Sequence, residues 1–411
     1  MAAASAISRV FMPTPQGRPA RAHSGARHRR TPPLTPQTAT FLARSVRGLE
    51  WLCAAEIESD LNASVFEIGH REIVFRAPVD PRLLKLGSID DLFLLCGRID
   101  EIDRGRLSLA RLAAGLRKLP LTRSLATVER LRPIRRSSGF EVIGSFLGRR
   151  NFNRTEIEFC AGAAISEITG MPFHDHDAVV SPERHASWRI HMRDSQAVVG
   201  LRIALRPLHR RDYRVSSAPG ALHPPVAYAM NMLSGAYPGC HILDPCCGTG
   251  TLLIEAKRLV PDVIAIGSDI DRDALLAAAS NGSNAHCRWI QADLGRLPYR
   301  DGFADCVVAN LPWGRQVHAK GAIQGNMSLA VDEALRALAP SGNAIFLASR
   351  GEKIVSDRAL LWSIPIRLAG HWANIQIVSA GDKNSKPPAC LQRRYGRSLQ
   401  RMWTKYGSSL P

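Results

Sequence analysis

The stretch that most constrains how this chain can fold runs from His241 to Ala256 of its 411 residues. It begins with a short apolar run, breaks at Asp244-Pro245 and turns through Gly248-Thr249-Gly250 before a helical apolar pattern starts. A strand, a glycine-bent loop and a helix N-terminus in this order form a natural ligand site. Glycine allows positive φ and lets a ligand approach the backbone closely. The stretch therefore predicts a ligand-binding loop at the end of a strand.

The spacing of the loop narrows the class of ligand. A dinucleotide fingerprint needs a third glycine three residues after the second, where this chain has Leu253. A P-loop needs Lys after its last glycine, and Thr251 stands there instead. Asp244 ends the strand, and its charge would repel a pyrophosphate. Dinucleotide and triphosphate sites are therefore disfavoured, and the remaining alternative to a ligand site is a glycine-rich turn without a ligand.

From His241 onward, predicted strands and helices alternate. The expected strands are 242–243, 263–267, 287–290, 306–309, 343–348, 364–368 and 374–378, and the expected helices are 251–259, 272–280 and 326–338. This alternation predicts an α/β fold, in which a parallel sheet carries helices on both faces. Only residues 369–373 separate the last two strands, so that pair must be antiparallel.

Two more acids follow the next two strands. Asp269 comes after the second strand and Asp293 after the third. A carboxylate at the end of the second strand can bind both ribose hydroxyls, as in other nucleotide-binding folds. Helix capping is the alternative role for each acid, but three acids at three successive strand ends favour a shared site.

These features resemble motif I and the Rossmann-like, seven-stranded fold of class I S-adenosylmethionine (SAM) methyltransferases. The resemblance implies SAM as the cofactor and implies that Asp293 accepts a hydrogen bond from the adenine amine, with Ile270 and Leu294 on the ring faces. It also implies that the Pro-rich joint at 217–225 packs over the methionine end of SAM. The cofactor-binding residues expected on this basis are Asp244, Pro245, Cys246, Gly248, Thr249, Gly250, Asp269, Ile270, Asp293, Leu294 and Asn310.

The fourth strand is followed by Asn310-Leu311-Pro312-Trp313-Gly314. This run resembles motif IV, Asn/Asp-Pro-Pro-aromatic, of methyltransferases that act on planar exocyclic amines. The Asn310 side-chain oxygen and the Leu311 carbonyl would accept the amine hydrogens and direct its lone pair, and Trp313 would stack on the extruded base. The expected catalytic residues are thus Asn310, Leu311, Pro312 and Trp313; their work is positioning and electrostatics, and no metal is needed. An Asn-x-Pro turn after a strand is the alternative.

Leu311 stands where this motif commonly has Pro, but its carbonyl is retained. Asn-Leu-Pro-aromatic-Gly resembles the variant found in THUMP-linked guanine-N2 methyltransferases of tRNA. The resemblance favours guanine N2 over adenine N6 as the methylated atom.

The charge balance suggests a polyanionic partner. The formal net charge is +18, with 54 Lys and Arg against 36 Asp and Glu, and the pI is about 10.1. Residues 1–49 hold eight Arg and no acid, which leaves 46 basic against 36 acidic residues, or +10, in the rest. Such a surface favours nucleic acid, although a solvated basic face is the alternative.

Several sequence features bear on the cellular compartment of the protein. Nine Cys without a Cys-x-x-Cys pair suit a reducing compartment. No apolar run has the length of a membrane span, so no membrane partner is expected. Residues 1–40 are predicted to be a disordered basic leader, with an organelle transit peptide as the alternative. The expected location is the cytoplasm, or the mitochondrion if the leader is a transit peptide.

Residues 41–210 precede the methyltransferase-like region 211–381. Their opening order, an edge strand at 41–44, a helix at 48–57 and strands at 65–68 and 72–75, suggests a small ferredoxin-like α+β unit. A candidate buried strand at 92–96 and a basic helix at 107–119 follow. Further on we expect a strand at 140–143, a helix at 155–169 capped by Thr155, and a hairpin of 188–192 with 197–201.

This upstream half resembles the RNA-binding region of THUMP-domain RNA modification enzymes. The resemblance rests on the helix opening at Gly48-Leu49-Glu50, the strand pair ending at 201–205, and the Leu-His-Arg-Arg-Asp-Tyr-Arg exit at 208–214. A nearby arginine cluster would follow phosphates, or else solubilise a loop; its members are Arg130, Arg132, Arg135, Arg136, Arg149, Arg150 and Arg154. The run of metal-ligand types at 174–177 is not expected to bind metal.

Together these observations predict a SAM-dependent RNA methyltransferase that forms N2-methylguanosine in tRNA, in the acceptor stem. The alternatives are a guanine-N2 or adenine-N6 methyltransferase of ribosomal RNA and, in another class, a non-catalytic RNA-binding protein that retains the fold. A DNA methyltransferase is disfavoured by the upstream half, and a dinucleotide oxidoreductase by the glycine spacing. The expected partner is RNA, with tRNA preferred; residues 382–411 are expected to be a basic tail, and the oligomeric state stays open.

Overall fold

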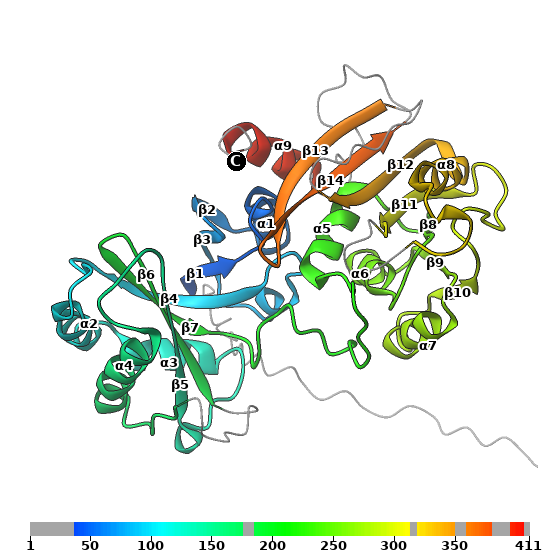
Figure 1. Ribbon diagram of the computed structural model, residues 1–411. Helices are drawn as coiled ribbons and strands as arrows, with labels where there is room; N and C mark the ends of the chain where they lie inside the picture. The colour runs from blue at the N-terminus through cyan, green and yellow to red at the C-terminus, as the bar shows by residue number, and fades with distance from the viewer. Residues whose placement is uncertain (1–36, 176–184, 313–318, 350–358, 380–394, 407–411) are drawn as a thin grey trace, which may run out of the picture. The chain divides into compact units, whose positions relative to one another are not determined.

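Two seven-stranded sheets organise the chain in the computed structural model, which describes residues 37–175, 185–312, 319–349, 359–379 and 395–406 (Figure 1). The first sheet has the strand order β2-β3-β1-β4-β7-β6-β5 and the second has the order β10-β9-β8-β11-β12-β14-β13. Among the described residues, no helix is long and apolar enough to cross a membrane. Residues 1–36 of the predicted leader lie outside the described residues, whereas residues 38–40, also predicted to be disordered, belong to strand β1.

The first sheet joins strands that are far apart in the sequence. Its members are β1 (Thr38–Arg44), β2 (Ser64–Gly69), β3 (Glu72–Pro78), β4 (Asp91–Ile99), β5 (Phe140–Phe146), β6 (Ala186–Arg193) and β7 (Gln196–Arg202). Only β5 and β6 pair in parallel, and β4 pairs antiparallel with β7. The predicted strands are all present, but β1 is not an edge strand, because it pairs with β3 on one side and β4 on the other.

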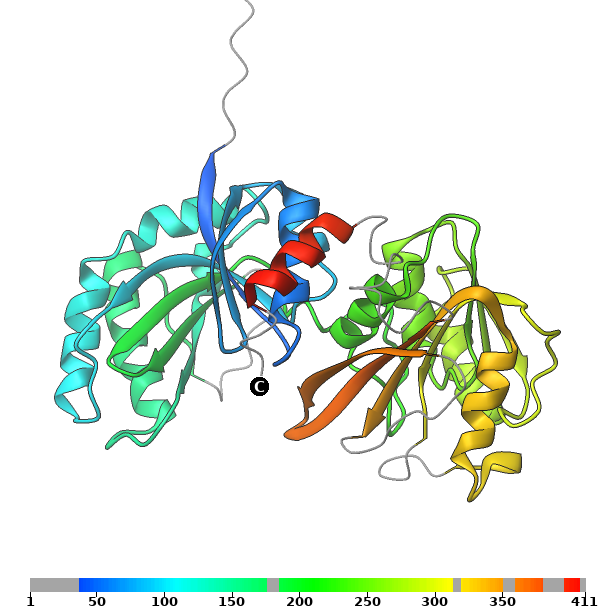
Figure 2. The same cartoon turned by 90° about the horizontal axis from the view of Figure 1, so that it is seen from above.

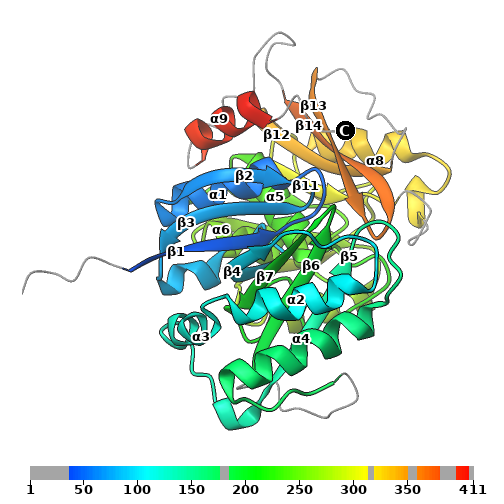
Figure 3. The same ribbon diagram turned by 90° about the vertical axis from the view of Figure 1, so that its left-hand side faces the viewer.

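Four α-helices cover one face of this sheet: α1 (Glu50–Leu61), α2 (Leu107–Arg117), α3 (Leu121–Glu129) and α4 (Arg154–Thr169). Their apolar residues join one core with the inward residues of the strands, and α2 lies beside α4 (Figure 3). Among the described residues, the opposite face holds a small apolar cluster of Leu42, Val74 and Phe93, with Leu95 and Val198 packed against it. Arg189 and Arg202 lie over the Phe93 ring there. In the part of the chain that the structure describes, the α-helices of this region thus pack on one face of the first sheet.

One local prediction in this region was wrong, and another stays a prediction. Thr155 does not cap α4; Asn153 does, since its side chain accepts from Glu156 N while the Glu156 carboxylate accepts from Asn153 N. Two of the seven arginines in the predicted phosphate-binding cluster bond to backbone carbonyls, and phosphate binding by the cluster stays a prediction. Arg132 donates to the Ile203 carbonyl, and Arg150 donates to backbone carbonyls at residues 102, 103 and 194.

The second sheet confirms the predicted α/β fold. Its strands are β8 (His241–Asp244), β9 (Ile264–Asp269), β10 (Arg288–Gln291), β11 (Ala304–Asn310), β12 (Leu338–Ser349), β13 (Ala359–Leu368) and β14 (His371–Ser379). The strands from β10 to β12 are parallel, and β14 pairs antiparallel with both β12 and β13. The antiparallel closing hairpin, predicted from the short 369–373 connection, is visible in orange in Figure 2.

Helices lie on both faces of the second sheet: α5 (Pro224–Ser234), α6 (Thr251–Leu259), α7 (Arg272–Asn281) and α8 (Met327–Arg336). Val226 of α5 and Leu253 of α6 pack with Ile242, whereas Val331 of α8 belongs to a separate core with Leu243. Ile242 and Leu243 are neighbours on β8, so the two cores lie on opposite faces of the sheet. Three adjacent parallel strands, β10, β9 and β8, end at the same edge of this sheet, whose faces carry helices.

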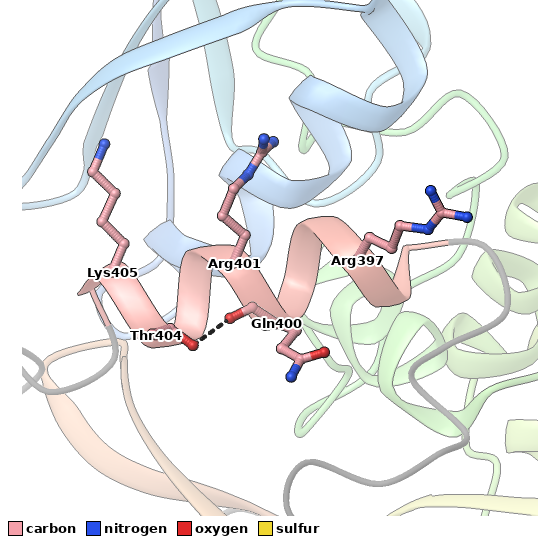
Figure 4. Close-up of a pocket in the computed structure, with 5 residues that line it drawn as sticks. All are labelled: Arg397, Gln400, Arg401, Thr404 and Lys405. Atoms are coloured by element: carbon pink, nitrogen blue, oxygen red, sulfur yellow. Dashed lines mark hydrogen bonds between the residues drawn. The ribbon is translucent and has the colours of Figure 1, made fainter.

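The predicted basic tail contains a packed helix, α9 (Gly396–Tyr406), which lies against α1 (red and blue in Figure 2). Tyr395 is buried and Trp403 lies with its ring centroid 5.1 Å from that of Trp51, so both aromatic rings pack in the protein and are not free to stack on bases. Arg397, Arg401 and Lys405 project from one side of α9, and with Gln400 and Thr404 they line a hollow of about 480 Å³ (Figure 4). Arg401 pairs with Glu58.

Candidate active site

The three strand-end acids lie at neighbouring positions along one edge of the second sheet. Asp244 is the last residue of β8, Asp269 is the last residue of β9, and Asp293 follows the end of β10 by two residues. Since β8, β9 and β10 are adjacent and parallel, their carboxyl ends meet at the same edge, where ligands of open α/β sheets bind.

Asp244 and Asp269 hold the glycine loop between them. Asp244 is buried and accepts from Cys246 N at 3.2 Å. Asp269 accepts from Gly248 N at 2.8 Å and from Asp271 N at 2.9 Å. Burial, and to a lesser degree the charge of Asp269, raises the pKa of the Asp244 carboxyl well above its usual value. Two mutually repelling carboxylates favour a positively charged ligand and disfavour a phosphate.

The two glycines of the loop serve different purposes. Gly248 has φ of +51°, and a β-carbon added to it would meet nothing within 4 Å. Gly250 has φ of +81°, but its added β-carbon would lie 2.6 Å from the Trp289 ring. Gly248 therefore leaves open space beside the strand-end acids, whereas Gly250 is required for the packing of Trp289.

Of the three residues expected to contact adenine, Ile270 is partly exposed, whereas Leu294 is buried and Asp293 is hydrogen-bonded to the backbone. The side chain of Ile270, directly after β9, is 36% exposed, while Leu294 is buried in the core that contains Ile323. Both carboxylate oxygens of Asp293 accept from backbone, one from Gly295 N and one from Ala322 N, each at 2.9 Å. Ile270 thus offers accessible apolar surface, and the adenine contacts expected of Asp293 and Leu294 stay predictions.

Asn310 is the last residue of β11, the strand beside β8. Its Nδ2 donates to the Gly220 carbonyl at 3.3 Å, and because an amide has one donor end and one acceptor end, its Oδ1 points the other way. The Cys246 thiol donates to the Asn310 carbonyl at 3.6 Å. The predicted catalytic asparagine therefore adjoins the glycine loop and presents an acceptor.

The remaining motif residues are placed only in part. The Leu311 side chain is buried, so only its carbonyl can serve a substrate, and Pro312 is half-buried. Trp313 lies outside the described residues, and its stacking on a base stays a prediction. His176 and Asp177 also lie outside them. Across the described part of the chain, no group of three or more His, Cys, Asp or Glu side chains is arranged to hold a metal.

The sequence analysis missed Asn281, the last residue of α7. Its Oδ1 accepts from Val215 N at 3.0 Å and Ser216 N at 2.9 Å, and its Nδ2 donates to the Ser216 carbonyl at 3.0 Å and the Thr249 carbonyl at 3.1 Å. One buried amide thus joins the segment before α5 to the glycine loop. No sequence signal could have found it, because all of its partners are backbone groups far away along the chain.

Glu255 of α6 was also missed. It is fully buried and accepts from Arg211 Nε at 2.9 Å, Tyr213 OH at 2.8 Å and Arg258 Nη1 at 2.8 Å. Arg211 also donates to the Gly87 carbonyl at 2.6 Å. The sequence did contain one indication of this role, because Glu255 is an acid inside the apolar stripe of a predicted helix. The segment 208–214, which leads into the methyltransferase-like region, is anchored on α6 by these bonds.

Solved structures share this fold. TrmN from Thermus thermophilus matches with a TM-score of 0.67 and 23% sequence identity over 84% of this chain and 99% of that chain. SMU.472, solved in complex with SAH, matches with a TM-score of 0.64 and 16% identity over 85% and 100%. The second sheet and its helices therefore have the fold of class I methyltransferases, and an additional α+β domain precedes them in the chain. Residues 211–359 match the family model UPF0020, described as an RMKL-like methyltransferase domain.

Curated relatives match over shorter segments. The tRNA (guanine(6)-N2)-methyltransferase of Thermus thermophilus is 30% identical over 222 residues, which are 52% of this chain and 63% of that protein. The U6 snRNA (guanine-N(2))-methyltransferase THUMPD2 of Mus musculus is 26% identical over 217 residues, 51% of this chain and 40% of that protein. This chain thus spans less than two thirds of the length of either relative.

Proposed function

We propose that this protein is a SAM-dependent RNA methyltransferase that methylates the exocyclic N2 of a guanosine in tRNA, within the acceptor stem. The observation that carries the proposal is the orientation of Asn310, whose amide donates to Gly220 and so presents its oxygen beside the glycine loop. An acceptor at that place suits an amine substrate. The names of the two relatives described above, both guanine-N2 methyltransferases, support the choice of atom.

The residues at the sheet edge fit SAM. Asp244 and Asp269 supply negative charge beside the open space at Gly248, Asp269 has lone pairs left for ribose hydroxyls, and the exposed part of Ile270 suits an aromatic ring. Pro245, Cys246, Thr249, Gly250, Asp293 and Leu294 complete the proposed cofactor site. When bound, SAM supplies an electrophilic methyl group on a sulfonium sulfur.

The chain's own part in the chemistry is positioning. Asn310 Oδ1 and the Leu311 carbonyl accept the two amine hydrogens, which concentrates the nitrogen lone pair that the base ring otherwise delocalises. A bound SAM would supply the methyl group and leave as S-adenosylhomocysteine, and the methylated nitrogen would release one proton to solvent. Pro312 holds the backbone of the motif, and Trp313 stacks on the base. Orientation rather than acid or base catalysis accounts for the rate.

Two features support RNA as the partner: the positive net charge and the region upstream of the methyltransferase-like domain. The net charge of +18 favours a polyanion, and residues 41–210 serve in this proposal as a ferredoxin-like and THUMP-like RNA-binding region that holds the 3′ end of tRNA. The proposed compartment is the cytoplasm, or the mitochondrion if residues 1–40 are a transit peptide. The described cysteines are free thiols, as a reducing compartment would maintain them.

A second substrate has a specific observation in its favour. The mouse relative is named for U6 snRNA, and its match covers a share of this chain similar to that of the tRNA enzyme. Guanine N2 of U6 snRNA is therefore the second candidate, with the same atom and the same site chemistry.

The test supplies labelled SAM and unmodified tRNA, U6 snRNA or ribosomal RNA, followed by digestion to nucleosides. We expect N2-methylguanosine from tRNA. Asn310→Ala should lower the methylation rate at least about a hundredfold, the cost of losing one oriented hydrogen-bonding group, and should keep SAM binding in a titration. Label in N6-methyladenosine, or only in another RNA, overturns the substrate; full activity in Asn310→Ala overturns the site.

A further inference from the structure

We infer that residues 215–223, called the strap below, position the catalytic Asn310, and that Asn281 and His223 are the positioning residues that hold the strap at its two ends. The inference rests on the proposed function, because it assigns Asn310 its role as an acceptor. Three contacts carry it: one at the start of the strap, one at its end and one in the middle, where it reaches the active site.

The start of the strap is held by Asn281. This side chain is 3% exposed and makes four hydrogen bonds of 2.9 to 3.1 Å, three of them with Val215 and Ser216. The fourth goes to the Thr249 carbonyl of the glycine loop. Only an amide supplies two acceptor and two donor contacts from one short side chain. Asn281 therefore ties the strap and the cofactor loop to the same point on α7.

The end of the strap is held by His223. Its Nε2 lies 2.7 Å from Asp90 Oδ1, in the turn before β4. Asp90 is itself fixed, because its other oxygen pairs with Arg71 at 3.2 Å and its backbone N donates to the Arg44 carbonyl at 2.7 Å. His223 directly precedes Pro224-Pro225, which open α5. The strap is therefore anchored to a rigid element at each end.

The middle of the strap reaches Asn310. Gly220 has φ of +79°, a left-handed conformation that L side chains rarely adopt, and its carbonyl accepts from Asn310 Nδ2 at 3.3 Å. If that carbonyl moves, the amide can rotate and offer its NH2 group to the substrate amine, which would place donor against donor. The strap thus decides whether Asn310 presents an acceptor or a donor.

The two anchors should differ in their kinetic effects. Asn281 also holds Thr249, so Asn281→Ala should weaken SAM binding and lower kcat. His223 lies in the strap and bonds to Asp90 rather than to the glycine loop, so His223→Ala should lower kcat by roughly tenfold to a hundredfold, the cost of a small misplacement, with a smaller loss of SAM affinity than Asn281→Ala. His223→Gln keeps an N–H that can reach Asp90 and should restore most of the lost rate.

A second readout does not depend on catalysis. Hydrogen exchange measured by mass spectrometry reports the backbone amides of Val215 and Ser216, which Asn281 protects. In Asn281→Ala their exchange should speed up roughly tenfold, the effect of losing about 1.4 kcal/mol of local protection. The matched control is Asn284→Ala, an exposed asparagine three residues further along, which should change neither exchange nor kinetics.

The outcomes separate this inference from the proposed function. If the wild-type protein methylates no RNA but shows the expected exchange difference, the proposed function fails and the anchored strap stands. If the wild type is active and His223→Ala keeps full kcat, the positioning role is overturned. If Asn281→Ala fails to fold, the comparison of His223→Ala with His223→Gln still tests the inference. Equal kcat values in both variants and the wild type would overturn the positioning role of the strap. A loss of kcat in His223→Ala that His223→Gln restores would support it.

Discussion

At the scale of single residues, Asp244 shows how a binding site costs stability. Its carboxyl is 1% exposed, accepts one backbone hydrogen bond and faces a second acid, and its pKa is raised well above the usual value, first by burial. A carboxyl with a raised folded-state pKa stabilises the fold fully at low pH, and that contribution is lost as pH rises through the folded pKa. As pH rises above the usual pKa of a carboxyl, Asp244 therefore lowers the stability of the fold until a cation binds beside it.

Asp244→Asn should consequently separate stability from binding. The amide cannot ionise, so the melting temperature of the ligand-free variant at neutral pH should rise. SAM affinity should fall by roughly tenfold or more, because a contact to a charged group is worth about 1.5–3 kcal/mol. In the wild type, affinity should fall as pH drops through the raised pKa, with proton release on binding visible by calorimetry in two buffers. A variant that melts lower and binds SAM normally would contradict this account.

At the scale of elements, the hydrogen bonds at the two ends of α4 fix where this helix begins and where it ends. The capping box of Asn153 and Glu156 satisfies two backbone N–H groups at the start of α4, and Arg106 pairs with the same glutamate. The helix ends at Gly170 in the left-handed conformation, as helices often do. These local bonds fix where α4 begins, and α4 in turn supplies Ile157 and Ile165 to the core.

Asn153→Ala should lower the free energy of unfolding by about 1 kcal/mol, the typical value of an N-cap. Thr155→Ala is the matched control, since Thr155 is exposed and follows the cap by two residues; it should stay within about 0.5 kcal/mol of the wild type. Urea denaturation followed by circular dichroism measures both. A larger effect at Thr155 than at Asn153 would restore the cap expected from the sequence.

Elements were predictable where the signal is local. The apolar runs and the 3.6-residue periodicity located every strand of the second sheet and the helices α6, α7 and α8, because burial on both faces imposes those patterns. The neighbours of β1 and the helix α9 were missed: strand pairing depends on segments that return much later, and a basic amphipathic helix looks like a solvated tail until its partner is known. α3, Leu121–Glu129, was not predicted at all.

The residues of the candidate site also separate into those that could be predicted from the sequence and those that could not. The structure brings together Asp244, Gly248, Asp269 and Asn310, which the sequence indicated because each lies at a strand end or in the turn that follows it; their roles stay predictions. Asn281 and Glu255 could not be assigned roles, because their roles exist only through partners brought close by folding. Motif residues can therefore be predicted from a sequence, whereas the side chains that hold a motif in place through distant backbone partners cannot.

At the scale of the whole molecule, an aromatic cluster joins three distant segments. Trp51 of α1, Trp362 of β13 and Trp403 of α9 lie with ring centroids 4.4 to 6.1 Å apart. Around them, Tyr395 OH donates to Asp60 at 3.1 Å and the Ser59 and Ser398 hydroxyls meet at 3.0 Å. Aromatic pairs at these distances add about 0.5–1.5 kcal/mol beyond burial. The C-terminal helix is therefore part of the folded core.

Trp403→Ala should destabilise the protein by about 2–3 kcal/mol, less than the 3–5 kcal/mol of a fully buried aromatic, because Trp403 is only partly buried. It should also shift the fluorescence maximum to longer wavelength, since Trp51, fully buried in the wild type, gains contact with water. Thr404→Ala, exposed on the same helix, should change neither the free energy of unfolding by more than about 0.5 kcal/mol nor the emission. An unshifted spectrum in Trp403→Ala, with unchanged stability, would mean that α9 does not cover Trp51 in solution and that the chain folds without its C-terminal helix.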